Sequence, residues 1–375
     1  MGKLHVVSVV GTRPEIIRLS EILKELDRVF NHTIIHTGQN YDFELSEIFF
    51  NELGIRKPDY FLDSAGKTTA ETVGNIIARS SEALEKENPD ALLVLGDTNS
   101  ALAAYSAKRL KIPVFHMEAG NRCFDERVPE EINRRIVDHI SDINLVYSSR
   151  ARDFLLREGF SPDRVIKTGS PMFEVLTAHK SSFDSSQILE NLKLVPHEYF
   201  VLSAHREENV SSKESLTKLI SAIQSLSKKY KFPIIFSVHP RTRKRIEDEK
   251  IKLPKEVQLL KPLGFSDYIT LQREAFCTIS DSGTISEESA ILNFPAVNIR
   301  ETHERLEAMD ESAVIMAGLN PERVLQAVEY ATQQNREVRE FSIPADYTSP
   351  NVSKKVARII MSYTDYVNRV VWGKN

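Results

Sequence analysis

The sequence predicts an α/β protein with two Rossmann-like domains, each built on a parallel sheet, and three observations support this. Short β-branched runs typical of buried parallel strands alternate with segments of helical periodicity. The alternation stops over a polar stretch at about residues 181–196 and then begins again. Nearly every polar cluster directly follows a predicted strand, where ligands bind in open parallel sheets.

The composition is that of a globular protein with room for two hydrophobic cores. The chain has 375 residues, of which 41% are apolar and 27% charged. A formal net charge of -4 argues against a general binder of nucleic acids or anionic membranes. The two cysteines, Cys123 and Cys277, cannot form a metal site by themselves and suggest a reducing compartment. Without a signal-peptide layout or an apolar run near ~20 residues, we expect a cytoplasmic protein.

In the first half of the chain, strands and helices alternate at the spacing of right-handed βαβ units. Its predicted strands are residues 4–10, 33–36, 91–95, 113–117 and 143–147, and its predicted helices are residues 16–30, 71–87, 101–110 and 130–141. Pro14 suits the first turn of the first helix. Residues 165–171 end this half.

The second half repeats the alternation. Its predicted strands are residues 200–204, 233–238, 257–260, 276–279, 296–300 and 314–318, and its predicted helices are residues 213–230, 286–292, 321–333 and 354–371. We expect an N-terminal domain of residues 1–175 plus 355–375, with the C-terminal helix crossing back to it, and a second domain of residues 176–354. Two such sheets facing each other would enclose a cleft lined by the loops after the strands.

The stretch from Ser280 to Glu288 turns from a strand directly into a helix. Free N–H groups and hydroxyls at such a helix N-terminus form an anion site, here carried by Ser282, Gly283 and Thr284. Gly283 has no Cβ, so a phosphate can approach the backbone closely. Glu288, one turn into the helix, is placed to accept from sugar hydroxyls. The alternative is an ordinary helix capped by Ser or Asp.

The two halves differ in the charged groups that follow their strands. The first half offers three acids and two arginines, Asp97, Glu118, Glu130, Arg13 and Arg18. The second half offers cationic and imidazole groups beside the anion site, namely His205, Arg206, His239, Arg241 and Arg305. This division suits a reaction in which one domain holds a diphosphate while the other moves a proton on the attached group.

Several of these residues also have purely structural interpretations. Asp97 is equally consistent with a helix cap, Glu130 with a first-turn acid favoured by the helix dipole, and His205 and His239 with hydrogen-bonded core histidines. No metal signal is present, because there is no H-x-x-x-H and no cysteine near a histidine. The nucleophile-elbow and Walker patterns are absent, and so is G-x-G-x-x-G after the first strand, which argues against a dehydrogenase.

Six motifs together resemble the non-hydrolysing UDP-N-acetylglucosamine 2-epimerase family, in the same order and across almost the whole chain. They are GTRPE at 11–15, GDT at 96–98, HMEAG at 116–120, PEEINR at 129–134, HRE at 205–207, and DSG at 281–283 with EE at 287–288. The resemblance implies a GT-B-like fold, a homodimer, a UDP-linked N-acetyl amino sugar as substrate, and no metal or nicotinamide cofactor. It also implies inversion at C2 in two steps, elimination of UDP to a 2-acetamidoglycal followed by re-addition.

The resemblance also assigns roles to individual residues. It implies catalytic acids at Asp97, Glu118 and Glu130, and active-site and diphosphate contacts at His205, Arg13, Arg18 and His239. It implies a phosphate loop at Ser282, Gly283 and Thr284, a ribose contact at Glu288, a further UDP contact at Arg305, and a uracil contact at Phe265 or Tyr268. The chemistry agrees, since a carboxylate can remove the weakly acidic C2 proton only if the leaving diphosphate is strongly stabilised. Which acid serves which face of the sugar stays open.

Three departures from the family pattern matter. Arg18 replaces a lysine of the first helix, and arginine cannot serve as a general acid at neutral pH. ERLEA at 304–308 stands where many members have ERPEG. QNYD at 39–42 replaces the Gln-x-x-Gln of the family's regulatory UDP-sugar site, which puts that regulation in doubt.

Four segments are more similar to one branch of the family, the UDP-N-acetyl-L-fucosamine synthases of capsule and O-antigen pathways. They are RPEIIRLS at 13–20, GQNYD at 38–42, GNRCFD at 120–125 and SYTDYVNR at 362–369. This branch converts UDP-2-acetamido-2,6-dideoxy-L-talose by the same C2 inversion. The alternatives are a plain UDP-GlcNAc/UDP-ManNAc epimerase, a GT-B glycosyltransferase, and a catalytically silent UDP-sugar-binding regulator, against which the intact acids argue.

Overall fold

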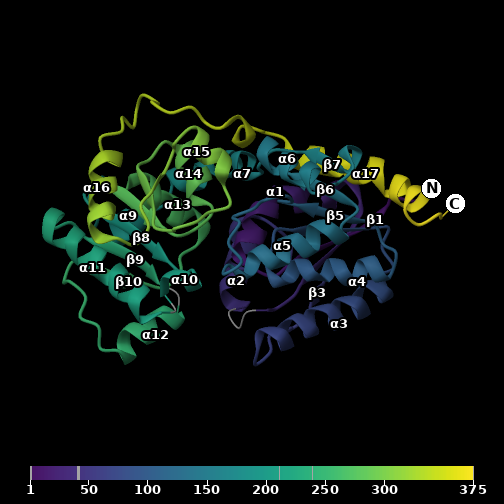
Figure 1. Cartoon of the computed structure of the whole chain (residues 1–375), viewed down its shortest axis with the longest axis horizontal. Helices are drawn as coiled ribbons and strands as arrows, with labels where there is room; N and C mark the ends of the chain where they lie inside the picture. The colour runs from purple at the N-terminus through teal and green to yellow at the C-terminus, as the bar shows by residue number, and fades with distance from the viewer. Residues whose placement is uncertain (1, 40–42, 211, 239, 375) are drawn as a thin grey trace. The chain divides into compact units, whose positions relative to one another are not determined.

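The computed structural model describes residues 2–39, 43–210, 212–238 and 240–374 and forms two compact α/β units (Figure 1). The first unit comprises Met1–Ala178 and Ala345–Asn375, and the second comprises His179–Pro344. Each unit contains one sheet of parallel strands joined through helices. The predicted fold class of two Rossmann-like α/β domains is therefore confirmed.

The first unit holds a seven-stranded parallel sheet. Its strands in spatial order are β3 (Tyr60–Phe61), β2 (Asn31–His36), β1 (His5–Val10), β4 (Ala91–Leu95), β5 (Val114–Met117), β6 (Ile143–Val146) and β7 (Val165–Lys167). The edge strand β3 is missing from the predicted set because a strand of two residues has no periodicity to detect. The central strands are buried on both faces, as their continuous apolar runs require.

The helices of the first unit lie before and after the second unit in the chain. They are α1 (Arg13–Val29), α2 (Phe43–Glu52), α3 (Thr69–Glu87), η1 (Asn99–Leu102), α4 (Ala103–Arg109), α5 (Pro129–Ile140), α6 (Ser149–Arg157), η2 (Pro162–Arg164), α7 (Met172–Ala178), η3 (Ala345–Tyr347) and α17 (Val352–Val370). Helix α1 starts earlier than predicted because Pro14 is tolerated in a first turn. Its apolar stripe of Ile16, Leu19 and Leu23 is buried, and α17 packs beside it (Figure 1).

The register of the first sheet brings the loops after β1, β4 and β5 to one edge. Val10 pairs with His36, and Leu95 pairs with Met117, so these strands end level with their neighbours. Asp97 and Glu118, which follow β4 and β5, therefore start from adjacent positions at the carboxyl edge of the sheet.

The second unit holds a six-stranded parallel sheet. Its strands in spatial order are β10 (Val257–Leu260), β9 (Ile234–Val238), β8 (Phe200–Ala204), β11 (Cys277–Ser280), β12 (Ala296–Asn298) and β13 (Ile315–Met316). Ser280 of β11 pairs with Ser203 of β8 and with Asn298 of β12. The loops after these three strands therefore share one edge.

The helices of the second unit complete its layers. They are α8 (Lys180–Asp184), α9 (Ile188–Leu192), α10 (Glu207–Val210), α11 (Lys213–Tyr230), α12 (Pro240–Asp248), α13 (Phe265–Glu274), α14 (Ile285–Leu292), α15 (Leu306–Asp310) and α16 (Pro321–Ala331). The polar stretch at 181–196 contributes α8 and α9, whose Phe183 and Ile188 are buried. Among the helices that the structure describes, none has the length and apolar character needed to cross a bilayer.

Candidate active site

Glu118 lies at the carboxyl end of β5 beside Arg18 of α1. Its carboxylate Oε2 is 3.4 Å from Nη1 of Arg18, and 10% of the Glu118 side chain is exposed. The Arg18 guanidinium in turn lies 5.9 Å from the centre of the Tyr147 ring. Two residues predicted for the site, one acid and one cation, are thus in direct contact.

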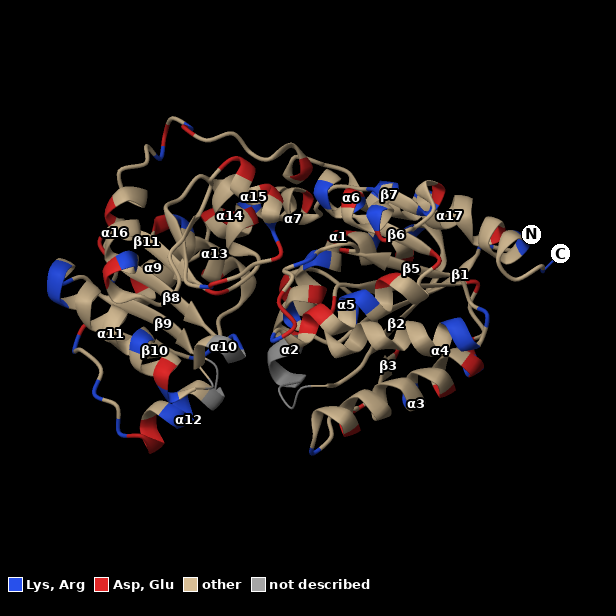
Figure 2. Ribbon diagram, viewed as in Figure 1, with Lys and Arg blue, Asp and Glu red and all other residues tan. Residues whose placement is uncertain are grey.

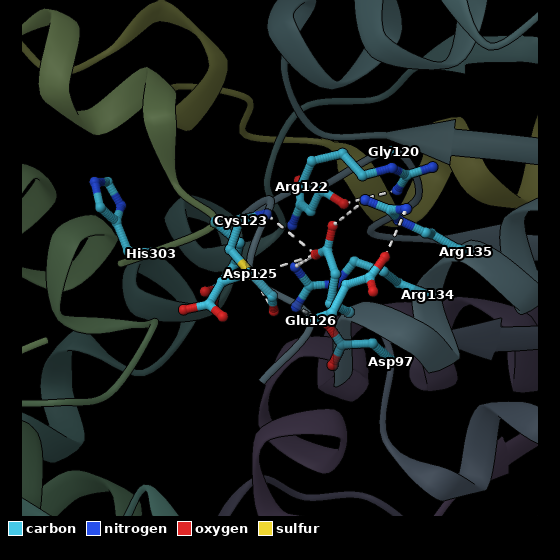
Figure 3. Close-up of polar contacts among 12 residues, drawn as sticks. Asp97, Gly120, Arg122, Cys123, Asp125, Glu126, Arg134, Arg135 and His303 are labelled. Atoms are coloured by element: carbon cyan, nitrogen blue, oxygen red, sulfur yellow. Dashed lines mark hydrogen bonds and ion pairs between the residues drawn. The ribbon is translucent and has the colours of Figure 1, made fainter. Parts of the chain in front are cut away.

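Asp97 follows β4 and is held by Arg134 of α5 (Figure 3). The Arg134 Nε and Nη2 atoms donate to Asp97 Oδ2 at 2.9 and 2.5 Å. The neighbouring Asn133 donates its side-chain N–H to the Asp97 carbonyl at 3.0 Å. The helix-cap interpretation of Asp97 is wrong, because Thr98 accepts from the Ser100 N–H and caps η1.

The first turn of α5 carries two adjacent acids with different surroundings. Glu130 is partly exposed, whereas Glu131 is buried. Glu131 accepts from the Cys123 N–H at 3.1 Å and from Arg134 at 2.9 Å. Burial alone would raise the pKa of Glu131, but the Cys123 N–H and the Arg134 charge hold it below its ordinary value. Glu131 therefore orders the Cys123 loop, and Glu130 is the more exposed of the two acids.

Glu15 is a buried acid that the sequence reasoning did not single out as a site residue. Its Oε2 accepts from the N–H groups of Gly11 and Thr12 at 2.6 and 3.1 Å, and its Oε1 accepts from the Thr98 hydroxyl. Burial raises its pKa to about 7, although these hydrogen bonds oppose the rise. The T-x-x-E pattern at 12–15 is a capping-box signature that could have indicated the contact of Glu15 with the Thr12 N–H, but not its contact with Thr98.

Arg13 occupies the same loop, at the start of α1. It is partly buried, and its guanidinium lies 5.9 Å from the centre of the Phe49 ring.

His205 in the second unit is oriented by the buried Asp281. Its Nδ1 lies 3.0 Å from Asp281 Oδ1, and the same carboxylate accepts from the backbone N–H of His205 and from Asn209. Burial raises the pKa of Asp281, but His205 and these N–H donors outweigh it and hold the pKa low. Because 44% of the His205 side chain is exposed, the core-histidine interpretation is wrong, and Nε2 is the ring nitrogen that does not face Asp281.

The predicted turn from β11 into α14 lies directly after Asp281. The hydroxyls of Ser282 and Thr284 are 3.0 Å apart, and α14 begins at Ile285. A Cβ on Gly283 would lie 2.7 Å from Oε1 of Glu304, so only glycine fits without a shift. Glu304 is itself fixed by Arg300 at 2.7 Å, which makes that shift costly.

Glu288 and Arg305 are both buried near this turn. Glu288 accepts from Nε2 of Gln272 at 3.0 Å. The Arg305 Nη2 atom lies 3.8 Å from Oε2 of Glu287, which precedes Glu288 on α14. The second unit also has an open hollow of about 300 Å³ at the ends of β12 and β13, whose lining includes Arg300 and Glu301.

The two aromatic residues predicted at a base differ in exposure. Phe265 is 3% exposed and packs edge-on against Phe183 at 5.5 Å, so it belongs to the interior. Tyr268, on the same helix α13, is partly buried and presents more of its ring. His239 lies outside the described residues, and so do positions 40–42 of the QNYD segment.

Along the described ribbon, Lys and Arg and also Asp and Glu occur in both units (Figure 2). Within the part of the chain that the structure describes, no group of three His, Cys, Asp or Glu side chains is placed to hold a metal ion. The polar groups described above form two sets, one at the carboxyl edge of the sheet in each unit. The first set is rich in carboxylates, and the second combines an oriented imidazole, arginines and a strand-to-helix turn.

Comparison with known proteins gives consistent matches. Residues 24–361 match the family described as UDP-N-acetylglucosamine 2-epimerase. A structure of UDP-N-acetylglucosamine 2-epimerase from Rickettsia bellii is 50% identical with a TM-score of 0.93, covering 99% of this chain and 100% of its own. The Methanocaldococcus jannaschii UDP-GlcNAc 2-epimerase in complex with UDP-GlcNAc and UDP is 34% identical with a TM-score of 0.89, covering 96% and 100%. A UDP-2,3-diacetamido-2,3-dideoxy-D-glucuronate 2-epimerase of Pseudomonas aeruginosa is 33% identical over 86% of this chain and 91% of its own.

Proposed function

Since the chain belongs to the UDP-N-acetylglucosamine 2-epimerase family, we propose that it inverts C2 of a UDP-linked 2-acetamido sugar by removing and returning a proton. Family membership makes it an isomerase, a UDP-sugar 2-epimerase. The observation that carries the mechanism is the division of chemistry between the two sheet edges. Carboxylates gather at the first, and an Asp281-oriented His205 beside the Ser282–Thr284 turn lies at the second.

The proposed reaction has two steps. A carboxylate of the first unit takes the C2 proton, the C–H electron pair forms the C1–C2 double bond, and UDP leaves with the electrons of the C1–O bond. The diphosphate oxygen then adds back to C1 while a proton returns to C2 from the opposite face. Asp97, Glu118 and Glu130 are the proposed proton carriers, because each starts at the carboxyl edge of the sheet or at the N-terminus of α5.

The second unit would make UDP a good leaving group. The charge that develops on the diphosphate needs donors that are already in place before the bond breaks. Gly283 provides close access to the backbone at the N-terminus of α14, and the Asp281 hydrogen bond fixes the His205 ring. Arg305 and Glu288 are the proposed UDP contacts beyond the diphosphate. The Methanocaldococcus jannaschii complex with UDP-GlcNAc and UDP supports a UDP-sugar ligand.

For the substrate we propose UDP-2-acetamido-2,6-dideoxy-L-talose, with UDP-N-acetyl-L-fucosamine as the product. The support is the resemblance of residues 120–125 to that branch of the family, combined with the position of this segment. It directly follows Glu118, and its Cys123 N–H is bound by Glu131 of α5. A segment that differs between branches therefore lies next to a proposed proton carrier.

UDP-N-acetylglucosamine is the second candidate substrate. The relatives from Rickettsia bellii and Methanocaldococcus jannaschii carry that name, and the former is 50% identical to this chain. Both candidates undergo the same chemistry at C2 and differ in the configuration of the ring and in the group at C6.

Incubation of the purified protein with each UDP-sugar in heavy water, followed by mass spectrometry, tests both candidates. We expect one deuterium at C2 and a second diastereomer from the 6-deoxy-L-talose sugar. Exchange with UDP-N-acetylglucosamine alone would move the assignment to the second candidate. If neither sugar exchanges, C2 epimerisation of these two sugars is wrong, and a GT-B glycosyltransferase or a UDP-sugar-binding regulator becomes the better hypothesis.

A further inference from the structure

Beside the turn that carries Glu118, the buried residues His116, Arg122 and Asp138 form a network that reaches the more exposed Glu158, and the proposed reaction does not use it directly. Asp138 of α5 is fully buried, with its Oδ1 3.0 Å from Nδ1 of His116 and its Oδ2 2.7 Å from Arg122. Arg122 also binds Glu158 through two N–H groups at 2.7 and 2.8 Å. Burying such groups is costly unless every charge is paired, so the network calls for an explanation.

Asp138 lies between His116 and Arg122 in the network. His116 presents Nδ1 to the Asp138 carboxylate and Nε2 to the Gly96 carbonyl at 2.8 Å, and both of these groups only accept hydrogen bonds. Burial raises the pKa of Asp138, but His116 and Arg122 outweigh it and hold the pKa below its ordinary value. Asp138 therefore stays ionised.

The network is attached to the backbone of both turns that carry predicted acids. Both Asp138 oxygens accept the Gly120 N–H at 3.2 Å, two residues after Glu118. His116 holds the carbonyl of Gly96, the residue before Asp97. A displacement of Asp138 would therefore shift the turns that carry the carboxylates of Glu118 and Asp97.

The turn at Glu118 needs such support. Glu118 has φ +64°, in the left-handed region, which costs an L-residue roughly 1 kcal/mol or more. Gly120 has φ +77°, and a Cβ there would lie 2.5 Å from the carbonyl oxygen of Ala151. A strained turn keeps its conformation only where its surroundings fix it, and the Asp138–Gly120 hydrogen bond supplies that fixation.

We propose that Asp138 is a positioning residue for the C2 proton transfer, which it supports by holding, through Gly120 and His116, the turns that aim Glu118 and Asp97. It acts without touching the sugar. The proposal rests on the proposed function, because it takes Glu118 and Asp97 to be proton carriers. A misplacement of about 1 Å in such a group costs on the order of 100-fold in rate.

Asp142, between α5 and β6, offers a matched control at the opposite end of β5. It is also buried, it accepts the Val114 N–H at 3.0 Å at the start of β5, and it pairs with Lys108 at 2.5 Å. Asp138→Asn and Asp142→Asn therefore each remove one buried negative charge that is bound to a cation and to a backbone N–H. Only Asp138 contacts the end of β5 that leads to Glu118, whereas Asp142 contacts its start.

The experiment compares kcat, KM and thermal stability of the two variants with those of the unsubstituted protein. We expect both variants to lower thermal stability by a similar amount. Asp138→Asn should lower kcat about 100-fold with KM changed little, whereas Asp142→Asn should leave kcat nearly unchanged. Asp138→Glu, which keeps the charge, should recover part of the rate. Equal kcat for Asp138→Asn and Asp142→Asn would overturn the proposal. If Asp138→Asn does not fold, His116→Gln replaces it, since the amide can donate to the Gly96 carbonyl while the contact of the His116 ring with Asp138 is lost.

Amide hydrogen exchange at Gly120 separates this proposal from the proposed function. Faster exchange at Gly120 in Asp138→Asn than in Asp142→Asn supports the hold on the turn, whichever sugar is the substrate. Unchanged exchange contradicts it even if the enzyme is an epimerase. An unsubstituted protein that exchanges no C2 proton contradicts the proposed function instead, and leaves the Gly120 result to decide whether Asp138 holds the turn.

Discussion

At the scale of single residues, the surroundings decide which acids can do chemistry. Glu131 and Asp138 are buried and accept from N–H donors and from an arginine, whereas Glu118 lies 3.4 Å from Arg18 with 10% of its side chain exposed and Glu130 is partly exposed. Glu15 differs from all of them, because its burial raises its pKa to about 7. These differences arise from burial and from hydrogen bonding to the charged form.

Glu15 should make stability depend on pH. A carboxyl whose pKa is raised in the folded state stabilises that state fully below its unfolded pKa near 4.5, and this stabilisation is lost as the pH rises to about 7. The loss amounts to about 3 kcal/mol. The side chain of Glu15→Gln can still accept from the Gly11 N–H and face Thr98, but it does not titrate. This variant should therefore show a smaller decrease in the free energy of unfolding between pH 4.5 and 7. Urea unfolding at several pH values measures it, and an unchanged slope would contradict the raised pKa.

Glu118→Gln should abolish turnover while preserving UDP affinity. The amide is close in size to the carboxylate and can still face Arg18, but it cannot carry the C2 proton. Deuterium incorporation reports turnover, and calorimetry with UDP reports binding. Turnover comparable to that of the unsubstituted protein would show that Glu118 is not a proton carrier.

At the scale of elements, the loop conformations matter as much as the strands and helices they connect. The Glu118 turn joins β5 to the segment before α5, and α5 contacts it again through Asp138. The same helix holds Asp97 through Arg134 and carries Glu130. One helix therefore fixes or carries all three proposed acids.

Two glycines test the difference between a constrained turn and a helix surface. Gly74 lies exposed in α3 with open space around its Cβ position, so Gly74→Ala should stabilise the protein by about 1 kcal/mol. Gly120→Ala should destabilise it by more than that, because a Cβ would lie 2.5 Å from the Ala151 carbonyl oxygen and φ is +77°. Thermal unfolding of both variants measures the effects. Equal effects would mean that the Gly120 turn is not constrained.

At the scale of the whole molecule, the proposed function divides binding and proton transfer between two units. Each unit has its own parallel sheet and its own core. The strand-to-helix turn for the diphosphate belongs to the second unit, and the acids belong to the first. Substitutions in the first unit should therefore impair proton transfer, and substitutions in the second unit should impair UDP binding.

UDP should raise the thermal stability of the protein through the second unit. At 100 times its Kd, a ligand that binds only the folded state stabilises it by about 2.7 kcal/mol. Gly283→Ala should remove this shift, since its Cβ would meet Glu304 where the diphosphate is proposed to bind. Glu118→Gln should retain the shift. A shift that persists in Gly283→Ala would place UDP elsewhere.

The sequence by itself determined the α/β class, the two parallel sheets and the family. Buried parallel strands require continuous apolar runs, and the turns that follow them require particular residues, so both are local signals. The short strand β3 and helices α8 and α13 were not predicted, because elements this short or weakly periodic form through their neighbours.

Only the tertiary structure decided which polar residues work together. The sequence drew attention to Asp97 and Glu118 but not to Arg134 or Asp138, which hold the turns around them. The sequence left open whether Asp97 caps a helix and whether His205 is a core histidine, and the structure contradicts both interpretations. The physical reason is that burial, charge pairing and the resulting pKa shifts depend on contacts between residues far apart in the chain, such as Glu15 with Thr98, which no local pattern encodes.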